Sequence, residues 1–266
     1  MVSDHKDAML RSGKSVVKKG DIVEGLRELG LDEGDVVLVH SSLSSFGYVE
    51  GGADAVIDAI LESVGPSGTV VVPTLTGSQK LSAANPPVFS PSSTPCWTGR
   101  IPETFRKRQR AIRSRHPTHS VAAIGAKAEY LTRDHEKCVT PCGIGSPYVK
   151  LAEIGGYILF MGVTLECNTT FHSVEELANV PYHMQPDWVE AKIVGDDGTV
   201  EIARIKIHLY GPARDFEKME PILISEGIMK MGRIGDSTLR LVRAKPMLDL
   251  TLKMVERNPE FLLKRT

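Results

Sequence analysis

Residues 35–72, DVVLVHSSLSSFGYVEGGADAVIDAILESVGPSGTVVV, decide the fold. The run 35–40 is short and almost wholly apolar, which is typical of a strand buried on both faces. Between residues 53 and 64 apolar side chains recur at helical spacing before a Gly-Pro pair ends the pattern: Val56, Ile57, Ile60, Leu61 and Val64. The apolar run 69–72 predicts a second strand. Because the helix carries the chain back along the sheet, the stretch predicts a βαβ unit with parallel strands.

The rest of the chain continues this alternation of strand-like and helix-like segments. Upstream, Ile22, Leu26 and Leu29 predict a helix that Gly30 can end. Downstream, the patterns predict a helix from about Arg100 with Pro102 in its first turn, strands at 120–125 and 157–162, and a helix at 170–180 that Pro181 ends. A hairpin follows, with strands at 188–194 and 199–209 around the turn 196–198. The last predicted elements are a helix near 214–226, strands near 228–234 and 238–243, and a terminal helix from about Pro246. We therefore predict one mixed α/β domain over residues 1–266, with an antiparallel C-terminal portion.

Composition and charge exclude several classes of protein. Of the 266 residues, 41% are apolar, which suffices for a substantial core and excludes a disordered chain. The 32 basic and 33 acidic residues give a formal net charge of -1, so no global field predicts nucleic acid as a partner. No apolar run is long enough to span a membrane, and the first residues hold no apolar signal core. Four cysteines are too few for a disulfide scaffold, and we therefore expect a soluble cytoplasmic protein.

Residues 74–97 differ in kind from the segments around them. The stretch is rich in Ser, Pro and Asn, has no periodicity, and is longer than ordinary connections. Long loops in compact domains are usually functional or disordered, so two interpretations stand side by side. The stretch is either a surface loop without a role or a flap over a site.

The turn after the first strand is built from small residues, with HSSLSSFG at 40–47 and Gly51-Gly52-Ala53 opening the helix. Ligands of parallel sheets bind at the carboxyl ends of the strands, and a helix N-terminus offers free N–H groups to anions. The turn matches neither the dinucleotide fingerprint nor the phosphate-binding lysine loop. It predicts either a binding loop for a phosphate or an extended chain, or a plain polar connection.

A local basic run occupies residues 100–116. It holds seven Lys or Arg residues against the single acid Glu103. The run is either a solvated helix face or a site for a phosphorylated ligand, because guanidinium groups bind phosphates through paired hydrogen bonds. Nucleic acid would need more basic surface and interleaved aromatic residues, so a polyanionic cofactor fits the run better.

His172 and Glu175 form the clearest catalytic candidate. If Thr169 caps a helix there, the two side chains lie one turn apart on the same face. The helix N-terminus disfavours a protonated imidazole, and a neutral imidazole beside a carboxylate is suited to act as a general base. A structural His–Glu pair is the alternative. A metal site would need a third ligand that the pattern does not supply, so we expect no metal.

The cysteines support two weaker hypotheses. His135, Cys138 and Cys142 have a loosely zinc-like spacing, but no second pair matches them, and buried free thiols are the alternative. Cys167 lies five residues before His172 and could act as a thiol nucleophile, although no activating context surrounds it. A cysteine or serine hydrolase therefore stays open as a function of another class.

Six segments together resemble the antibiotic N-acetyltransferase family, whose best-known members are the aminoglycoside N(3)-acetyltransferases. They are VLVHSSLSSFGYVEGGADAVIDAI (37–60), GTVVVPTLTG (68–77), RSRHPTHSVAAIG (113–125), GSPYVKL (145–151), GYILFMGVTLECNTTFHSVEE (156–176) and MGRIGDSTLRLV (231–242). Their order and spacing extend over the chain from about residue 20 to 243, which is more specific than any single motif.

The resemblance implies a single α/β/α domain with a mixed central sheet, and an acetyl-coenzyme A-dependent transferase acting on the 3-amino group of an aminoglycoside. It implies that His172 is the essential histidine, which takes the proton of the acceptor amine, and that Glu175 is its acidic neighbour. It also implies that the cofactor lies along His40, Ser41, Ser42, Leu43, Ser44, Ser45, Phe46, Gly47, Gly52, Ala53, Thr98, Gly99, Arg100, Ile101, Pro102, Ser114 and His116. The basic run then has a ligand, the phosphates of coenzyme A. Donors of the turn 41–45 could stabilise the oxyanion.

The acceptor half departs from the family pattern, whereas the cofactor half is intact. Residues 175–182, EELANVPY, and 140–143, TPCG, differ from the resistance enzymes. An aminoglycoside carries several ammonium groups and requires an acidic pocket, for which Glu166, Glu175 and Glu176 supply some carboxylates. An amino sugar or another small amine is therefore the alternative acceptor. We expect a small-molecule amine as partner, with no nucleic acid and no membrane, and leave a homodimer open.

Overall fold

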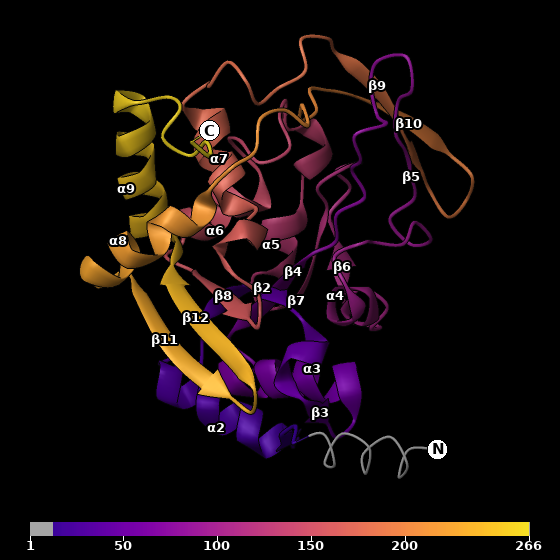
Figure 1. Cartoon of the computed structure of the whole chain (residues 1–266). Coiled ribbons are helices and arrows are strands. Elements are labelled where there is room, and N and C mark those ends of the chain that lie inside the picture. The colour runs from indigo at the N-terminus through magenta and orange to yellow at the C-terminus, as the bar shows by residue number, and fades with distance from the viewer. Residues whose placement is uncertain (1–12, 266) are drawn as a thin grey trace.

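A seven-stranded mixed sheet forms the centre of the computed structural model, which describes residues 13–265 (Figure 1). Its strands, in spatial order, are β11 (Met229–Ile234), β12 (Ser237–Arg243), β8 (Tyr157–Met161), β2 (Val36–Ser41), β4 (Thr69–Pro73), β7 (Val121–Gly125) and β6 (Ile112–Arg113). The three central strands β8, β2 and β4 are parallel, and the strands outside them pair antiparallel. The mixed sheet and the antiparallel C-terminal strands predicted from the sequence are confirmed.

Helices cover both faces of this sheet. One face carries α2 (Lys19–Leu29), α3 (Gly52–Val64) and α4 (Arg100–Phe105), and the other carries α5 (Ala128–Thr132), α6 (Pro147–Glu153), α7 (Thr170–Leu177), α8 (Met219–Ser225) and α9 (Ala244–Arg257). Along β2, Val37 and Val39 pack in the first core, whereas Leu38 packs in the second. Because successive side chains of a strand point to opposite faces, one strand serves both cores. The predicted α/β/α arrangement is confirmed.

The βαβ unit predicted at residues 35–72 is present as β2, α3 and β4. The two strands pair in parallel, with Val37 opposite Val70. The upstream helix α2 ends at the predicted glycine, since Gly30 adopts a left-handed φ of 98° and its N–H donates to the carbonyl of Arg27. A residue without a Cβ adopts this conformation at little cost.

A smaller three-stranded sheet lies apart from the main one, in the order β10-β9-β5 (Figure 1). β9 (Val189–Val194) and β10 (Val200–Ile205) form the predicted antiparallel hairpin, and β5 (Val88–Phe89) pairs in parallel with β9. Phe89 is fully buried in the core of this sheet. The long stretch 74–97 therefore supplies one strand of the small sheet. A third, two-stranded parallel pair consists of β1 (Val16–Val17) and β3 (Tyr48–Val49).

Three predicted helices differ from the observed ones. The helix from Arg100 ends at Phe105, so the basic run 100–116 does not form one helix face. The helix predicted at 170–180 ends at Leu177, and the region 214–226 begins with a 3-10 turn at Phe216–Lys218 before α8. Helices this short are marginal alone, so tertiary packing rather than periodicity fixes their ends.

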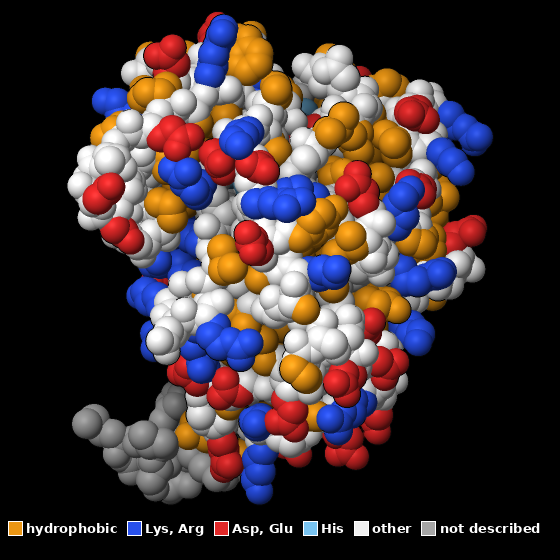
Figure 2. Space-filling model, turned by 180° about the vertical axis from the view of Figure 1, so that it is seen from behind, with side chains coloured by type: hydrophobic (Ala, Val, Ile, Leu, Met, Phe, Trp, Pro, Cys, Tyr) orange, Lys and Arg blue, Asp and Glu red, His pale blue; other side chains and the backbone are white. Residues whose placement is uncertain are grey.

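The surface carries both signs of charge. On the face shown in Figure 2, Lys and Arg side chains are interspersed with Asp and Glu, in keeping with the formal net charge of -1. Among residues 13–265, no helix combines the length and the apolar composition needed to cross a bilayer.

Candidate active site

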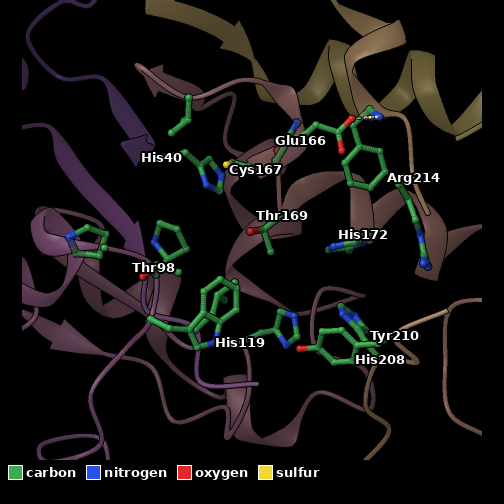
Figure 3. A pocket seen from close by; sticks show the side chains of 18 of the residues that line it. His40, Thr98, His119, Glu166, Cys167, Thr169, His172, His208, Tyr210 and Arg214 are labelled. Carbon is green, nitrogen blue, oxygen red and sulfur yellow. Dashed lines mark hydrogen bonds between the residues drawn. The ribbon is translucent and has the colours of Figure 1, made fainter. Parts of the chain in front are cut away.

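A cavity of about 540 Å³ opens at the carboxyl ends of the parallel strands (Figure 3). His40 and Ser41 at the end of β2 and Pro73 at the end of β4 form part of its wall. Parallel sheets bind ligands at this position, because the strand ends and the loops that follow them leave a crevice. The remaining wall comes from segments far apart in the sequence, within 97–102, 163–172 and 208–216 among others.

A second hollow of about 610 Å³, here called the groove, adjoins this cavity and follows the turn after β2. Its wall consists of Ser41, Ser42, Leu43, Ser44, Gly47, Tyr48, Val49, Gly52, Gly99 and Arg100. Ser41 and Gly99 line both hollows, so the two adjoin. The turn passes so close to the chain that a Cβ on Gly47 would collide with the backbone oxygen of Ser15. At Gly52 a Cβ would meet nothing within 4 Å, so the start of α3 is open to the groove.

His172 and Glu175 lie on α7 as the sequence predicts, and their side chains form a hydrogen bond. The distance from His172 Nδ1 to Glu175 Oε2 is 2.7 Å, and the side chains are 26% and 0% exposed. Because an ionised carboxylate only accepts, Nδ1 is the donor, and in the neutral form of the ring Nε2 carries the lone pair. The imidazole projects into the cavity in Figure 3. A histidine held in this way is suited to accept a proton from a bound molecule.

Glu175 is a buried anion. Burial raises its pKa, but the hydrogen bond from His172 and the nearby charges, including Arg214, outweigh burial and lower the pKa to about 2. Arg214 Nε donates to Glu175 Oε1 at 3.0 Å. The carboxylate is therefore ionised at neutral pH and can stabilise positive charge on His172.

A second histidine–glutamate pair lies beside the first. Glu176 Oε1 accepts a hydrogen bond from His208 Nε2 at 2.6 Å and from the backbone N–H of Cys142 at 3.0 Å. The ring centroid of His183 lies 4.9 Å from that of His172 and 4.1 Å from that of His208. Burial lowers the pKa of His183 and lowers that of His208 well below its ordinary value. Both rings are therefore neutral at pH 7.

The sequence analysis did not predict His183, His208 or Arg214 as parts of this site. They lie in connecting segments that carry no local motif. The one available signal was the pair of adjacent acids, Glu175 and Glu176, on a helix with a buried face. Two carboxylates in such a helix require partners, because an unpaired buried charge is very costly.

Known proteins are similar to this chain in sequence and in fold. The sequence model described as Aminoglycoside 3-N-acetyltransferase matches residues 38–256. The chain belongs to the aminoglycoside 3-N-acetyltransferase family. The resemblance inferred from six sequence segments is thereby confirmed.

Members of the family match almost the whole chain. Aminoglycoside N(3)-acetyltransferase VII of Streptomyces paromomycinus is 31% identical over 277 residues, covering 94% of this chain and 95% of that protein. The structure of AAC-IIIb in a binary complex with CoASH has a TM-score of 0.79 at 27% identity, covering 95% of this chain and 100% of that one. A histidine-to-alanine mutant of AAC(3)-IVa in complex with a gentamicin has a TM-score of 0.80 at 28% identity, covering 95% and 93%. The α/β/α architecture is thus the family fold.

The structure brings most of the predicted cofactor residues of this family member to the two hollows. His40, Ser41, Thr98, Gly99 and Pro102 line the cavity. Ser41, Ser42, Leu43, Ser44, Gly47, Gly52, Gly99 and Arg100 line the groove. His40 is stacked on Phe160 with 5.2 Å between ring centroids, and burial lowers its pKa to about 3, so it is neutral.

The remaining predicted cofactor residues line neither hollow. Phe46, Ala53 and Ile101 are buried in the first core. The other three make side-chain contacts inside the protein. Ser45 Oγ donates to the carbonyl of Ser42, and Ser114 Oγ forms a hydrogen bond of 2.9 Å with His135 Nδ1. The ring centroid of His116 lies 4.7 Å from that of His135. These residues support the walls from behind and do not face either hollow.

The basic run 100–116 is mostly used in local contacts. Arg106 pairs with Glu103 at 2.6 Å, and Arg108 pairs with Asp54 at 2.6 Å. Arg100 is the cation of this run that lines the groove in the described part of the chain. The prediction of a solvated helix face is wrong, because the helix is short and the side chains fold back onto the protein.

The start of α7 corrects a second prediction. Thr169 makes no side-chain capping hydrogen bond and has a helical backbone, with φ -59° and ψ -26°. Asn168 Oδ1 instead accepts from the N–H of Thr170 at 3.1 Å. Asn and Thr are both good capping residues, so the sequence pattern could not distinguish these neighbours. Thr169 lines the cavity.

The cysteine hypotheses have different outcomes. Both ring nitrogens of His135 are occupied, by Ser114 Oγ and by the carbonyl of Pro141 at 2.8 Å, so His135 forms no ligand cluster with its two nearby cysteines in the described chain. Those cysteines, Cys138 and Cys142, are buried free thiols, as the alternative predicted. Cys167 lines the cavity, but burial raises its pKa, which opposes the thiolate that a nucleophile needs.

Proposed function

We propose that this chain transfers the acetyl group of acetyl-coenzyme A to the 3-amino group of an aminoglycoside. Membership of the family supports the proposal, as do a relative in complex with CoASH and another in complex with a gentamicin. The observation that carries it is His172, held by Glu175, on the wall of a cavity that adjoins the groove. A base in a cavity beside a second hollow can meet both an acyl donor that extends from that hollow and an amine in the cavity.

The groove suits coenzyme A by its chemistry. The open N-terminus of α3 at Gly52 and the guanidinium of Arg100 both provide donors for phosphate oxygens. Where the groove meets the cavity, Ser41 Oγ is buried without a hydrogen-bond partner among residues 13–265. A polar group of the ligand can satisfy this hydroxyl. Acetyl-coenzyme A supplies an activated thioester carbonyl when it is bound.

His172 performs the proton transfer in this proposal. An ammonium nitrogen has no lone pair, so His172 Nε2 takes one proton from the acceptor and frees its nitrogen for attack on the thioester carbonyl carbon. As the C–N bond forms and the C–S bond breaks, the nitrogen releases its second proton to solvent, and the leaving thiolate takes up the proton that His172 holds. Glu175 stays ionised and stabilises the positive charge that His172 gains. Arg214 binds the other oxygen of Glu175 and fixes the direction of the carboxylate.

The turn after β2 supplies a donor for the oxyanion. The N–H of Ser42 donates to the carbonyl of Met161, and the N–H of Ser45 donates to the carbonyl of Ser42, so both are already used. The Ser41 hydroxyl has no such partner within residues 13–265. Ser41 Oγ is therefore one candidate donor of this turn for the oxyanion.

An amino sugar or another small amine is the second candidate acceptor, and the charge of the cavity wall favours it. Of the described side chains in this wall, Glu166 is the carboxylate and Arg214 the guanidinium. Glu166 Oε1 already accepts from the backbone N–H of Phe216 at 2.8 Å. An acceptor with several ammonium groups requires more acidic partners than one with a single ammonium group.

Release of the coenzyme A thiol distinguishes these functions. The full chain is incubated with acetyl-coenzyme A and a panel of aminoglycosides and amino sugars, with 3-N-acetylated aminoglycosides as matched controls. Thiol release that disappears with the blocked acceptors supports the first proposal, and release with amino sugars alone selects the second. A burst of acyl-enzyme without acetyl-coenzyme A would indicate the hydrolase and overturn both.

We further propose that residues 13–265 fold as one domain, that the chain works in the cytoplasm, and that it forms a homodimer. One sheet supplies both main cores, which supports the single domain.

The four free cysteines support a reducing compartment, as the cytoplasm is. Val88, Val200 and Ile202 are exposed on the small sheet and leave apolar surface for a second copy. Calorimetry, cell fractionation and light scattering test the three statements, and a monomeric mass would remove the homodimer.

A further inference from the structure

Three histidines converge in the cavity, although a general base requires one. His172 lies on α7, His183 follows that helix, and His208 follows β10. One ring nitrogen of each lies within 4.8 Å of the other two. All three side chains line the cavity, and His183 and His208 are buried. Three imidazoles with an open side are a ligand set of zinc sites that bind a further molecule.

Buried carboxylates orient two of these rings. His172 Nδ1–H donates to Glu175 Oε2, and His208 Nε2–H donates to Glu176 Oε1. Each ring therefore has one nitrogen fixed by an anion and a lone pair on the other nitrogen. Histidines that bind metals are held in this way, by a carboxylate or carbonyl on the ring nitrogen that does not touch the metal.

His183 provides an independent observation. Its Nε2 is buried without a hydrogen-bond partner among the described residues, although buried polar atoms are nearly always paired. The nearest carboxylate oxygen of Glu176 is 3.8 Å away, which is too far for a hydrogen bond. This unpaired nitrogen belongs to a side chain that is 2% exposed and lines the cavity. A ligand that accepts its lone pair would remove the cost of burying it.

The other side of the His183 ring can adapt to such a ligand. Its Nδ1 lies 3.2 Å from Glu175 Oε2 and 3.0 Å from Arg214 Nη2. With the proton on Nδ1, the ring donates to Glu175 and presents the lone pair of Nε2. Because the guanidinium is planar and rigid, Arg214 must then shift as a whole away from the Nδ1–H, which also changes its contacts with Glu175 and with the carbonyl of Pro212.

The formal charge of the cluster also favours a cation. Glu175 and Glu176 are two buried carboxylates, and Arg214 is the guanidinium that pairs with Glu175 in the described structure. Two carboxylates against one guanidinium leave a negative charge that a divalent ion can compensate.

We propose that His172, His183 and His208 form a binding site for Zn²⁺, and that the ion competes with the acceptor for His172 Nε2. Zn–N distances of about 2.0–2.1 Å place tetrahedral ligand atoms roughly 3.3 Å apart, so the rings close slightly around the ion. A lone pair that is bound to Zn²⁺ cannot take a proton, so the metal-bound chain is an inhibited form. The inhibition, but not the metal site, rests on the proposed function.

Direct titration tests the site without any acetyl donor. The full chain, freed of metal by a chelator, is titrated with ZnCl₂ in a calorimeter, and Co²⁺ is used as a coloured substitute. We expect one ion per chain and the visible Co²⁺ absorption that accompanies a low coordination number. Binding of no ion, or a Co²⁺ spectrum of the hydrated ion, overturns the site.

Matched variants identify the ligands. The neighbouring set of His119, Cys142 and His208 also has converging ligand atoms, so His183→Gln and Cys142→Ala separate the two sets. We expect His183→Gln to weaken Zn²⁺ binding at least about 10-fold, and Cys142→Ala to leave it unchanged. Glu176→Gln should weaken binding about 10- to 100-fold, because His208 loses its carboxylate. Cys167→Ser controls for the exposed thiol of the cavity and should bind as the wild type does.

The outcomes separate the metal site from the proposed function. Circular dichroism establishes that each variant is folded, and Glu176→Gln keeps the test decisive if His183→Gln does not fold. Weaker binding in either cysteine variant, with wild-type binding in His183→Gln, contradicts the histidine site. A chain that acetylates amines but binds no Zn²⁺ refutes the inference alone. A chain that binds Zn²⁺ through these histidines but acetylates nothing refutes the proposed function alone.

Discussion

The groove and the cavity adjoin, yet they are built in opposite ways. The groove takes most of its wall from one continuous segment, residues 41–52, where β2 ends and α3 begins. The cavity takes its wall from segments between residues 40 and 216, and two of its histidines, His172 and His208, are held by buried carboxylates. The donor end of the site therefore depends on local backbone shape, whereas the reacting end depends on long-range electrostatics.

The largest expected effect comes from the cavity. His172→Ala should lower kcat about 10²- to 10⁴-fold, because the general base is lost. The affinity for coenzyme A should stay nearly unchanged, since His172 lines the cavity and not the groove. Thiol release measures kcat, and calorimetric titration with coenzyme A measures the affinity.

A wild-type kcat in this variant would refute the proton-transfer assignment. A parallel loss of coenzyme A affinity would refute the separation of the two hollows. His40→Ala is the comparison variant. His40 also lines the cavity, at the end of β2, but its Nε2 has no hydrogen-bond partner within residues 13–265, so no carboxylate holds this nitrogen as Glu175 holds Nδ1 of His172.

The buried anion of the cavity predicts an unusual pH dependence of stability. Glu175→Gln should lower the free energy of unfolding at pH 7 by about 3 kcal/mol, because Arg214 is left without its partner. The folded-state pKa of Glu175 is depressed from 4.5 to about 2, so its stabilising contribution is present above pH 4.5 and is lost as the pH falls toward 2. Urea unfolding at a series of pH values measures this contribution.

The variant should accordingly lose less stability than the wild type as the pH falls below 4.5. Parallel profiles of wild type and Glu175→Gln would show that the carboxylate is not held as an ion by its neighbours. That result would also remove the electrostatic contrast between the cavity and the groove.

A smaller effect is expected in the groove. Arg100→Ala should raise the KM for acetyl-coenzyme A about 10-fold with little change in kcat, since one charge-assisted hydrogen bond to a phosphate is worth about 1.4 kcal/mol. Arg110→Ala is the matched control, because Arg110 belongs to the same basic run and lines a hollow elsewhere on the protein. Steady-state kinetics with varied acetyl-coenzyme A measures both variants. An equal increase in KM for both would indicate a general effect of charge and not a contact in the groove.

The smallest expected effect concerns the start of α7, which carries the catalytic pair. Asn168→Ala should destabilise the protein by about 1 kcal/mol, because the N–H of Thr170 loses its acceptor. Thr169→Ala should cost less through the helix, because Thr169 makes no capping hydrogen bond. Thermal unfolding compares the two variants, and a larger loss in Thr169→Ala would contradict the observed cap.

Sequence periodicity predicted the elements whose signals are local. The unit of β2, α3 and β4 was predicted because apolar residues occupy consecutive positions in the strands and one stripe in the helix. The pairing of His172 with Glu175 was predicted because side chains three residues apart meet on a helix. The end of α4 at Phe105 was not predicted, because it follows from ion pairs and packing that periodicity does not contain.

By itself, then, the sequence determined the α/β/α architecture, the family and the pairing of His172 with Glu175, for which we propose a catalytic role. Only the tertiary structure brought His183, His208 and Arg214 to that pair. It also decided that, of the seven basic residues in the run 100–116, Arg100 is the one that lines the groove. The physical reason is the range of the interactions. Periodicity and turn chemistry act over a few residues, whereas burial and charge act between atoms that are close in space and distant along the chain.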